Sequence, residues 1–208
     1  MESLTIRDRV KGAIIGTLIG DALGLGPHWF YNIDELREKY GSWINDYAPV
    51  KENPAYPKVS NSRSQLKPGD VSQTGQVYIQ LLESITENSG YDEEDFTQRL
   101  DRLLATLDGT QSGGRYTDED MRDVWHGRRN GFDWHHVGSY SYTANAAIRT
   151  PILAAYYSGN PGLAAKYALS NIQLTHINPL IVGQSIAFEL TVSALINGVT
   201  MPQVSSTQ

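Results

Sequence analysis

The sequence predicts an all-α protein that folds as a single domain over residues 1–208. Several segments carry apolar residues at the three- and four-residue spacing of an amphipathic helix. Serine, threonine, asparagine or aspartate, which favour helix starts, precede most of these segments. No segment alternates apolar and polar residues over the length of a strand. A chain of 208 residues is long enough for one sizeable hydrophobic core, so one domain is expected.

Composition and charge exclude several classes of partner and of chemistry. The hydrophobic fraction of 40% and the charged fraction of 19% are those of a soluble globular protein. The net charge of −6 argues against a nucleic-acid partner, because phosphate binding requires clustered lysine and arginine. The chain has no cysteine, which excludes disulfides, thiolate metal sites and a cysteine nucleophile. We therefore expect a cytoplasmic protein that does not bind nucleic acid.

The opening apolar run AIIGTLIG imitates a signal peptide, because it follows Arg7, Arg9 and Lys11. Asp8 interrupts this basic region, however, and Asp21 follows the run. The run is also too short to span a bilayer. We therefore interpret it as part of a core helix and expect no association with a membrane.

The stretch TIRDRVKGAIIGTLIGDALGLGPHWFY (5–31) is the segment around which we expect the chain to pack. Thr5 and Asp8 have capping-box spacing, and the sequence GLGP at 24–27 ends the helix. Glycines recur every four residues from position 12 to 24, which leaves a stripe that another backbone or a ligand can approach closely. Asp21 lies beside this stripe. It either belongs to a site or caps a neighbouring segment of a tightly packed helix.

The remaining elements follow from caps and periodicity. A short helix is expected from 32 to 40, and the stretch 42–68 is expected to be a long loop, which in a compact domain is often functional. Asp70 or Ser72 is expected to cap the next helix. Pro151 is expected to kink the helix 143–157 or to end its first part. Further helices are predicted over 92–107, 117–129, 161–170 and 179–197, and the acidic run 92–95 is interpreted as a solvated helix start rather than a metal site.

Six segments together resemble one known family. They are GAIIGTLIGDALG (12–24), PHWFYN (27–32), NPAY (53–56), PGDVSQTGQ (68–76), NAAIRTPILAAYY (145–157) and LTHINPLIVGQSIAF (174–188). Their order and spacing resemble the ADP-ribosylglycohydrolase family, and within it the branch that includes jellyfish J1-crystallin. Each segment alone is weak evidence for the resemblance, because GxxxG and Thr-His pairs are common. The six segments together are specific to this family.

The resemblance implies a multi-helical orthogonal bundle in which the opening helix is buried and loops at one end form a cleft. Active members of the family use this cleft to remove ADP-ribose from a protein side chain, with two magnesium ions held by aspartates and threonines. The expected partner is therefore ADP-ribose, a related small molecule or an ADP-ribosylated protein.

The sequence departs from the family pattern in three places. The family's Thr-Asp-Asp-Thr motif is Val71-Ser72-Gln73-Thr74 here, so both carboxylates are replaced. The carboxylate that hydrolytic members carry after GDALG falls on His28. The closing Asp-x-Asp-Thr motif is absent before Gln208, so we expect the chain to lack the family's C-terminal third and the remaining helices to expose apolar surface. Hard cations require anionic oxygens, so no metal ligand is predicted and magnesium is not expected as a cofactor.

The candidate site residues follow from the resemblance and from local chemistry. His28 and Asp21 are the predicted catalytic residues, and His28 is alternatively a turn histidine stacked on Trp29 or Tyr31. The predicted substrate-binding residues are Ser72, Gln73, Thr74, Asn145 and His176. His176 precedes a helix start, where backbone amides favour anions, and capping is its alternative role. Arg149 is expected to pair with an acid such as Asp21, and phosphate binding is its alternative role.

Two functions remain open from the sequence. The first is an ADP-ribosylglycohydrolase-like hydrolase of an ADP-ribosyl or related N- or O-glycosidic bond, with a degenerate metal site and chemistry centred on His28. The second is a non-catalytic protein that binds ADP-ribose or a nucleotide, or a crystallin-like structural protein. The replaced carboxylates favour the second function, and the retained polar side chains favour the first.

Overall fold

The computed structural model describes residues 4–205 and confirms the all-α prediction. Its α-helices are α1 (Ile6–Leu25), α2 (Ile33–Tyr40), α3 (Pro57–Arg63), α4 (Gln73–Asn88), α5 (Glu93–Leu104), α6 (Glu119–Arg129), α7 (Asn145–Tyr156), α8 (Pro161–Gln173), α9 (Pro179–Ile196) and α10 (Met201–Ser205). A 3-10 turn, η1 (Trp134–His136), lies between α6 and α7. Within the described residues there is no strand, and one parallel bridge joins Ser139 to His176.

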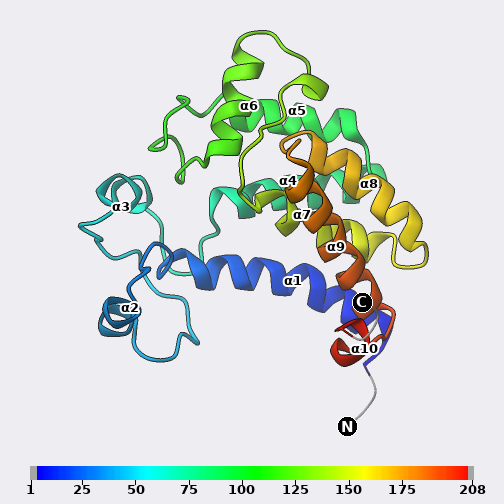
Figure 1. Ribbon diagram of the computed structural model, residues 1–208, viewed down its shortest axis with the longest axis horizontal. Helices are drawn as coiled ribbons and strands as arrows, with labels where there is room; N and C mark the ends of the chain where they lie inside the picture. The colour runs from blue at the N-terminus through cyan, green and yellow to red at the C-terminus, as the bar shows by residue number, and fades with distance from the viewer. Residues whose placement is uncertain (1–3, 206–208) are drawn as a thin grey trace.

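Helix α7 lies at the centre of the packing, where it contacts α1, α4, α8 and α9. Figure 1 shows α1 along one side of the molecule, with α2 and α3 beyond its C-terminal end and α10 near its N-terminal end. The hydroxyl of Tyr78 on α4 donates to the carbonyl of Ile14 on α1 at 2.9 Å. Arg9 on α1 donates to the carbonyl of Leu195 on α9 at 3.2 Å. These bonds link α1 to the bundle.

Helix starts follow the predicted capping. Thr5 and Asp8 form a reciprocal capping box at the start of α1. The side chain of Asn32 accepts hydrogen bonds from the first turn of α2. Of the two candidates before α4, Ser72 is the cap, and Asp70 lies outside the helix.

One local prediction was wrong. The stretch 42–68, expected to be a loop throughout, contains α3, which begins at Pro57, a residue that fits the first turn of a helix. Of the two effects expected of Pro151, ending the first part of the helix is excluded, because Pro151 lies inside α7. Proline cannot donate to the carbonyl of Ala147 four residues earlier, and the hydroxyl of Thr150 donates to that carbonyl instead, at 2.8 Å. A neighbouring side chain therefore satisfies the carbonyl that the proline leaves free.

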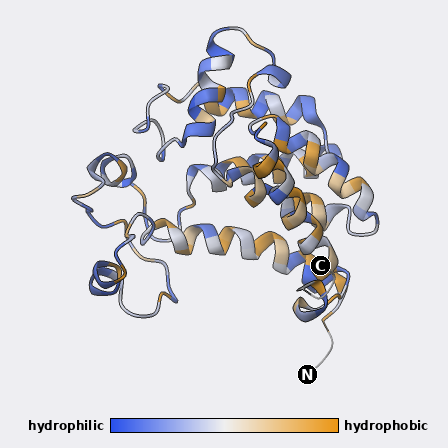
Figure 2. Ribbon diagram, viewed as in Figure 1, coloured by the Kyte–Doolittle hydropathy of each residue, from blue (hydrophilic) through white to orange (hydrophobic). Residues whose placement is uncertain are grey.

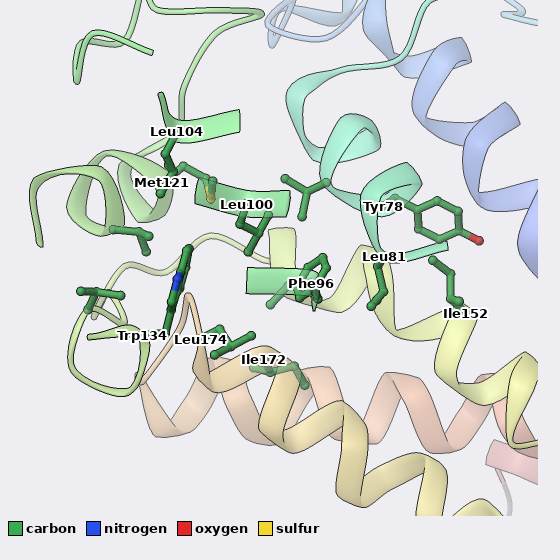
Figure 3. Packing of buried hydrophobic residues seen from close by; sticks show 14 of the residues in the cluster. Tyr78, Leu81, Phe96, Leu100, Leu104, Met121, Trp134, Ile152, Ile172 and Leu174 are labelled. Carbon is green, nitrogen blue, oxygen red and sulfur yellow. The ribbon is translucent and has the colours of Figure 1, made fainter. Parts of the chain in front are cut away.

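The main hydrophobic core lies between α4, α5, α6, α7 and α8 (Figure 3). Its fully buried members include Tyr78, Leu81, Phe96, Leu100, Val124, Leu153 and Ile172. Each large apolar side chain that is removed from water contributes about 1.5–3 kcal/mol to folding. The core therefore fixes the helices whose first turns, at α4, α6 and α7, meet at one place on the surface.

Helices α1 and α9 leave apolar side chains exposed. Ile15 and Ile19 of α1 are 53% and 42% exposed, and Phe188 and Leu190 of α9 are 45% and 44% exposed. Figure 2 shows hydrophobic colour along much of α9. A methyl group added to any of the glycines at positions 12, 16 and 20 of α1 would have no neighbour within 4 Å. The opening helix is therefore buried on one side only, and the close approach expected at its glycine stripe is not made by the described residues.

Helix α9 is long and apolar enough to cross a membrane by length and composition alone. Core helices of soluble proteins meet the same criterion, and α9 packs against α7 and α8. We therefore describe α9 as a member of the bundle. The cytoplasmic location and the lack of a membrane partner stay predictions.

Glu189 of α9 is a buried acid without a partner among the described residues. Its side chain has no solvent exposure, and neither carboxylate oxygen is hydrogen-bonded. Burial raises the pKa of Glu189 from 4.5 to about 7. The native state therefore binds this proton more tightly than the unfolded chain does. The free energy of unfolding falls as the pH rises from about 4.5 to about 7, and this contribution is constant above that window.

Replacing Glu189 with glutamine is expected to stabilise the protein at pH 8 by on the order of 2 kcal/mol, because the variant has no buried group to ionise. At pH 4.5 the variant and the original protein are expected to have nearly equal stability. Urea unfolding at both pH values measures the difference. Glu38→Gln at an exposed position of α2 is the control. Equal stability of Glu189→Gln and the original protein at pH 8 would contradict the raised pKa of Glu189 in the folded state.

Candidate functional site

A cleft of about 200 Å³ lies where the C-terminal end of α1 faces the first turns of α4 and α7. Six predicted site residues line it: Asp21, His28, Ser72, Gln73, Thr74 and Asn145. The lining also includes Trp29, Arg63, Arg115, Tyr116 and Asp118. Asp118 is the N-cap residue just before α6, so three helices start at the cleft. A smaller cavity continues inward past Asn145 to Asp120 and Arg149.

Asp21 holds the start of α4. Its Oδ2 atom accepts from the Ser72 backbone N–H at 2.7 Å, and its Oδ1 atom accepts from the Ser72 hydroxyl at 2.5 Å. Ser72 in turn caps the helix by accepting from Gly75 N at 3.2 Å. A methyl group at Gly75 would overlap both Asp21 Oδ2 and the side chain of Val71. Glycine is therefore required for this close contact, and Asp21 is both a lining residue and the cap of a neighbouring segment.

Replacing Gly75 with alanine is expected to lower the free energy of unfolding by about 1–3 kcal/mol, because the added methyl group forces Asp21 away from Ser72. The matched control is Gly16→Ala on α1, where open space surrounds the position. This control is expected to stabilise the protein by about 0.5–1 kcal/mol through helix propensity. Thermal unfolding of both variants measures the difference, and a stabilised Gly75→Ala would contradict the contact.

Asp118 and Asp120 are functional candidates that the sequence analysis missed. In the sequence, the motif Thr117-Asp118-Glu119-Asp120 indicates only a helix start. In the structure, Asn145 Nδ2 donates to Asp118 Oδ2 and to Asp120 Oδ1, both at 3.0 Å. Asn145 therefore orients both carboxylates, and its own Oδ1 atom has no hydrogen-bond partner among the described residues. Two acids with alternating spacing at a helix start were the signal that was available in the sequence.

A chain of hydrogen bonds through Thr143, His176 and Thr175 holds Asp120 on the side away from the cleft. The Thr143 hydroxyl donates to Asp120 Oδ1 at 3.0 Å and lies 2.9 Å from His176 Nε2. Because a hydroxyl has one proton, His176 Nε2 carries the hydrogen that Thr143 accepts. His176 Nδ1 then accepts from the Thr175 hydroxyl at 2.9 Å. This chain fixes one tautomer of His176 and the position of Asp120.

His176 lies behind the cleft rather than in its lining. Its side chain has no solvent exposure, and burial lowers its pKa to about 3, so the ring is neutral. Direct contact between His176 and a ligand in the cleft is therefore not supported. Capping does not describe its position either, because Asn178 caps α9. His176 acts through Thr143 on the cleft.

Arg149 does not pair with an acid such as Asp21, and that prediction was wrong. It is buried on α7, where it donates to the side chain and carbonyl of Asn171 and to the Thr175 hydroxyl at 2.5, 2.7 and 2.8 Å. Burial lowers the pKa of Arg149 to about 10, and the guanidinium stays charged at neutral pH. Its neutral partners are all on α8 or just after it, so Arg149 joins α7 to α8.

Aromatic rings surround His28 at the opening of the cleft. The His28 ring stacks on Trp29 with centroids 5.2 Å apart, as its alternative role requires, and it lines the cleft as well. Trp29 also contacts Tyr56 and Tyr116 at centroid distances of 5.3 and 5.0 Å. Asn53 of the NPAY segment holds this turn by donating to the carbonyl of Trp29 at 2.8 Å. The exposed ring faces could stack against a planar ligand group.

Two titratable groups of the cleft have shifted pKa values. Burial raises the pKa of Asp118, and the hydrogen bond from Asn145 opposes part of this shift. Burial and the nearby charge of Arg63 lower the pKa of His28, whereas Asp118 and Asp21 oppose the shift. In both cases burial disfavours the charged form of the side chain. The cleft therefore holds a carboxyl and an imidazole, two groups that can exchange protons with a ligand.

Comparison with known proteins decides the family. A family model described as ADP-ribosylglycohydrolase matches residues 2–207, nearly the whole chain. The chain belongs to the ADP-ribosylglycohydrolase family. This membership supports a hydrolase-like function. The J1-crystallin-like branch stays a prediction.

An archaeal relative has a longer chain. The chain is 24% identical to an uncharacterized protein of Archaeoglobus fulgidus over 188 residues, which cover 90% of this chain and 56% of that protein. The chain therefore spans little more than half the length of this archaeal relative.

Proposed function

We propose that this chain binds ADP-ribose or a related glycoside in the cleft and hydrolyses its glycosidic bond with Asp118 and His28. The observation that carries the proposal is the half-buried carboxyl of Asp118, which Asn145 orients in the same cleft as His28. Glycoside hydrolysis requires one group to protonate the leaving group and another to activate water. Asp118 is the proton donor and His28 the base that activates water. Asp21, a predicted catalytic residue, instead positions the start of α4.

The proposed chemistry does not use paired magnesium ions, because the donor atoms present do not fit them. Ser72 and Gln73 offer a hydroxyl and an amide where two carboxylates would be required. Both oxygens of Asp21 already accept hydrogen bonds from Ser72. In the part of the chain that the structure describes, no three acidic or histidine side chains converge as metal ligands.

The predicted substrate-binding residues have distinct roles in this proposal. Asn145 Oδ1 can accept from a ligand hydroxyl while its amide group holds Asp118 and Asp120. Gln73 Nε2 donates to Thr117 Oγ1 at 3.0 Å, which leaves its carbonyl oxygen as an acceptor toward the ligand. Thr74 offers its hydroxyl from the second position of α4. The aromatic rings beside His28 supply a surface on which the adenine ring of ADP-ribose can stack.

A second candidate function is non-catalytic binding of ADP-ribose or a nucleotide. The observation that favours it is the clamp between Asp21 and Ser72, because it uses a cleft carboxylate for structure rather than chemistry. Both candidates require a ligand in the cleft. A crystallin-like structural role does not.

Isothermal titration with ADP-ribose in the presence of EDTA tests the proposal. We expect binding at one site, and we expect Asn145→Ala to weaken it by about tenfold through loss of an acceptor and of the orientation of Asp118. Asn130→Ala, just after α6, is the control and should bind as the original protein does. No binding of ADP-ribose under any metal condition would favour the structural role and refute the proposal.

A further inference from the structure

Arg63, the last residue of α3, is a buried cation without a partner in the part of the chain that the structure describes. Its side chain is only 3% exposed. Among residues 4–205, no acceptor lies within hydrogen-bonding distance of its guanidinium, and no carboxylate pairs with it. The other buried arginines differ in this respect. Arg99 bonds Asp95 and two glutamates, and Arg149 bonds Asn171 and Thr175.

Arg63 lines the cleft, and its guanidinium keeps some contact with solvent. Arg63 belongs to the cleft lining, and its nitrogen atoms are not among the sealed polar atoms that lack a partner. They therefore reach solvent through the cleft. Burial lowers the pKa of Arg63, but arginine remains protonated at neutral pH. A charged guanidinium that lines a cleft and lacks a partner among the described residues can bind a carboxylate or phosphate group of a ligand.

Two helix starts add positive potential to the same cleft. The backbone N–H groups of Gln73 and Thr74 at the start of α4 have no acceptor among the described residues. The same holds for Asn145 and Ala146 at the start of α7. Such free N–H groups, together with the helix dipole, favour an anion. The dipoles supplement the unpaired charge of Arg63 and do not by themselves define a site.

The acids of the cleft form no ion pair with Arg63 among the described residues, although the charges of Asp21 and Asp118 oppose the lowering of its pKa. Asp21 is held by Ser72, and Asp118 is held by Asn145. Each of these carboxylates therefore has short-range partners of its own. Arg115, the second arginine of the lining, donates to the carbonyl of Val71. Arg63 is the charged group of the lining whose hydrogen-bonding capacity is unmet.

We propose that Arg63 and the first turn of α4 form an anion subsite that binds a phosphate group of the ligand. The ligand class is a phosphate-bearing glycoside, such as a sugar joined to a nucleoside diphosphate. This assignment rests on the proposed function, because ADP-ribose carries a diphosphate. Arg63 would position the ligand, whereas Asp118 and His28 act on the glycosidic bond.

The variant Arg63→Met tests the subsite with pyrophosphate and with ADP-ribose as probes. Isothermal titration in EDTA is expected to show binding of both probes to the original protein. Arg63→Met is expected to weaken both by about tenfold or more, because a charge-assisted, two-pronged contact is lost. Arg63→Lys keeps the positive charge but loses the planar guanidinium. Its affinity for each probe is expected to lie between those of the original protein and Arg63→Met. Arg37→Met at an exposed position of α2 is the control and should leave both affinities unchanged.

Thermal unfolding separates a binding role from a structural one. Without ligand, Arg63→Met is expected to unfold at a higher temperature than the original protein, because it removes a buried, unpaired charge. With pyrophosphate added, only the original protein and Arg37→Met should gain stability. A lower unfolding temperature for Arg63→Met without ligand would show that the side chain supports the fold, and it would overturn the subsite.

The two probes distinguish failure of the subsite from failure of the proposed function. Binding of pyrophosphate that requires Arg63, without any binding of ADP-ribose, would support the subsite and refute the proposed function. Binding of ADP-ribose that Arg63→Met leaves unchanged would support the proposed function and overturn the subsite. Binding of pyrophosphate and of ADP-ribose to the original protein, with both lost in Arg63→Met and kept in Arg37→Met, would support the subsite and the proposed function together.

Discussion

Replacing Asp118 with asparagine is expected to lower kcat for hydrolysis of an ADP-ribosyl bond by about 100-fold or more, because the side chain can no longer donate a proton to the leaving group. KM is expected to change little, since the shape of the side chain is kept. Chromatographic measurement of released ADP-ribose from an ADP-ribosylated peptide gives both constants. The original protein is also expected to show a bell-shaped pH profile. The lowered pKa of His28 extends the activity of a base toward lower pH, and the raised pKa of Asp118 extends the activity of an acid toward higher pH.

Glu119→Gln is the matched control for Asp118. It makes the same change of charge one residue further along, at an exposed position in the first turn of α6. Activity of this control should equal that of the original protein. An Asp118→Asn variant that retains full activity and keeps the alkaline limb of the pH profile would remove Asp118 from the proton transfer.

Replacing His176 with alanine is expected to lower the free energy of unfolding by about 4 kcal/mol. The change leaves the hydroxyls of Thr143 and Thr175 without their buried partner and opens a cavity. Because Thr143 holds Asp120, the start of α6 is expected to lose its alignment as well. Urea unfolding measures the loss of stability, and the rate of hydrolysis in the remaining folded protein measures the effect on the cleft.

His135→Ala is the control for His176, because the His135 side chain is 73% exposed. The control is expected to change stability by less than about 0.5 kcal/mol. Equal stability of His176→Ala and the original protein would contradict the buried chain from Thr175 to Asp120.

The sequence predicted most of the helices because their starts are encoded locally. Thr5, Asn32 and Ser72 have side chains that satisfy first-turn amides whatever the rest of the fold does. The sequence alone did not decide between a kink and a helix end at Pro151, because the effect of this proline depends on the hydroxyl of Thr150, one residue away. Helix α3 was missed because a short helix with little apolar periodicity resembles a loop.

The candidate site was predicted in part for a similar reason. Family-like segments placed Asp21, His28 and Asn145 at one cleft, where the structure also finds them. Asp118 and Arg63 lie outside those segments, so only the packing of α6 and α3 against the cleft reveals them. The depth of His176 could not be read from its neighbours in the sequence. Burial is a property of the packed bundle, and a histidine before a helix start can lie on either side of a cleft wall.

The central claim is that a cleft without paired carboxylates at the start of α4 acts on a glycosidic bond through Asp118 and His28. Its most direct test is the rate of hydrolysis of an ADP-ribosylated peptide in EDTA compared with the rate in millimolar MgCl₂. We expect equal rates, both lost in Asp118→Asn. Hydrolysis that occurs only with magnesium and is unaffected by Asp118→Asn would contradict the account.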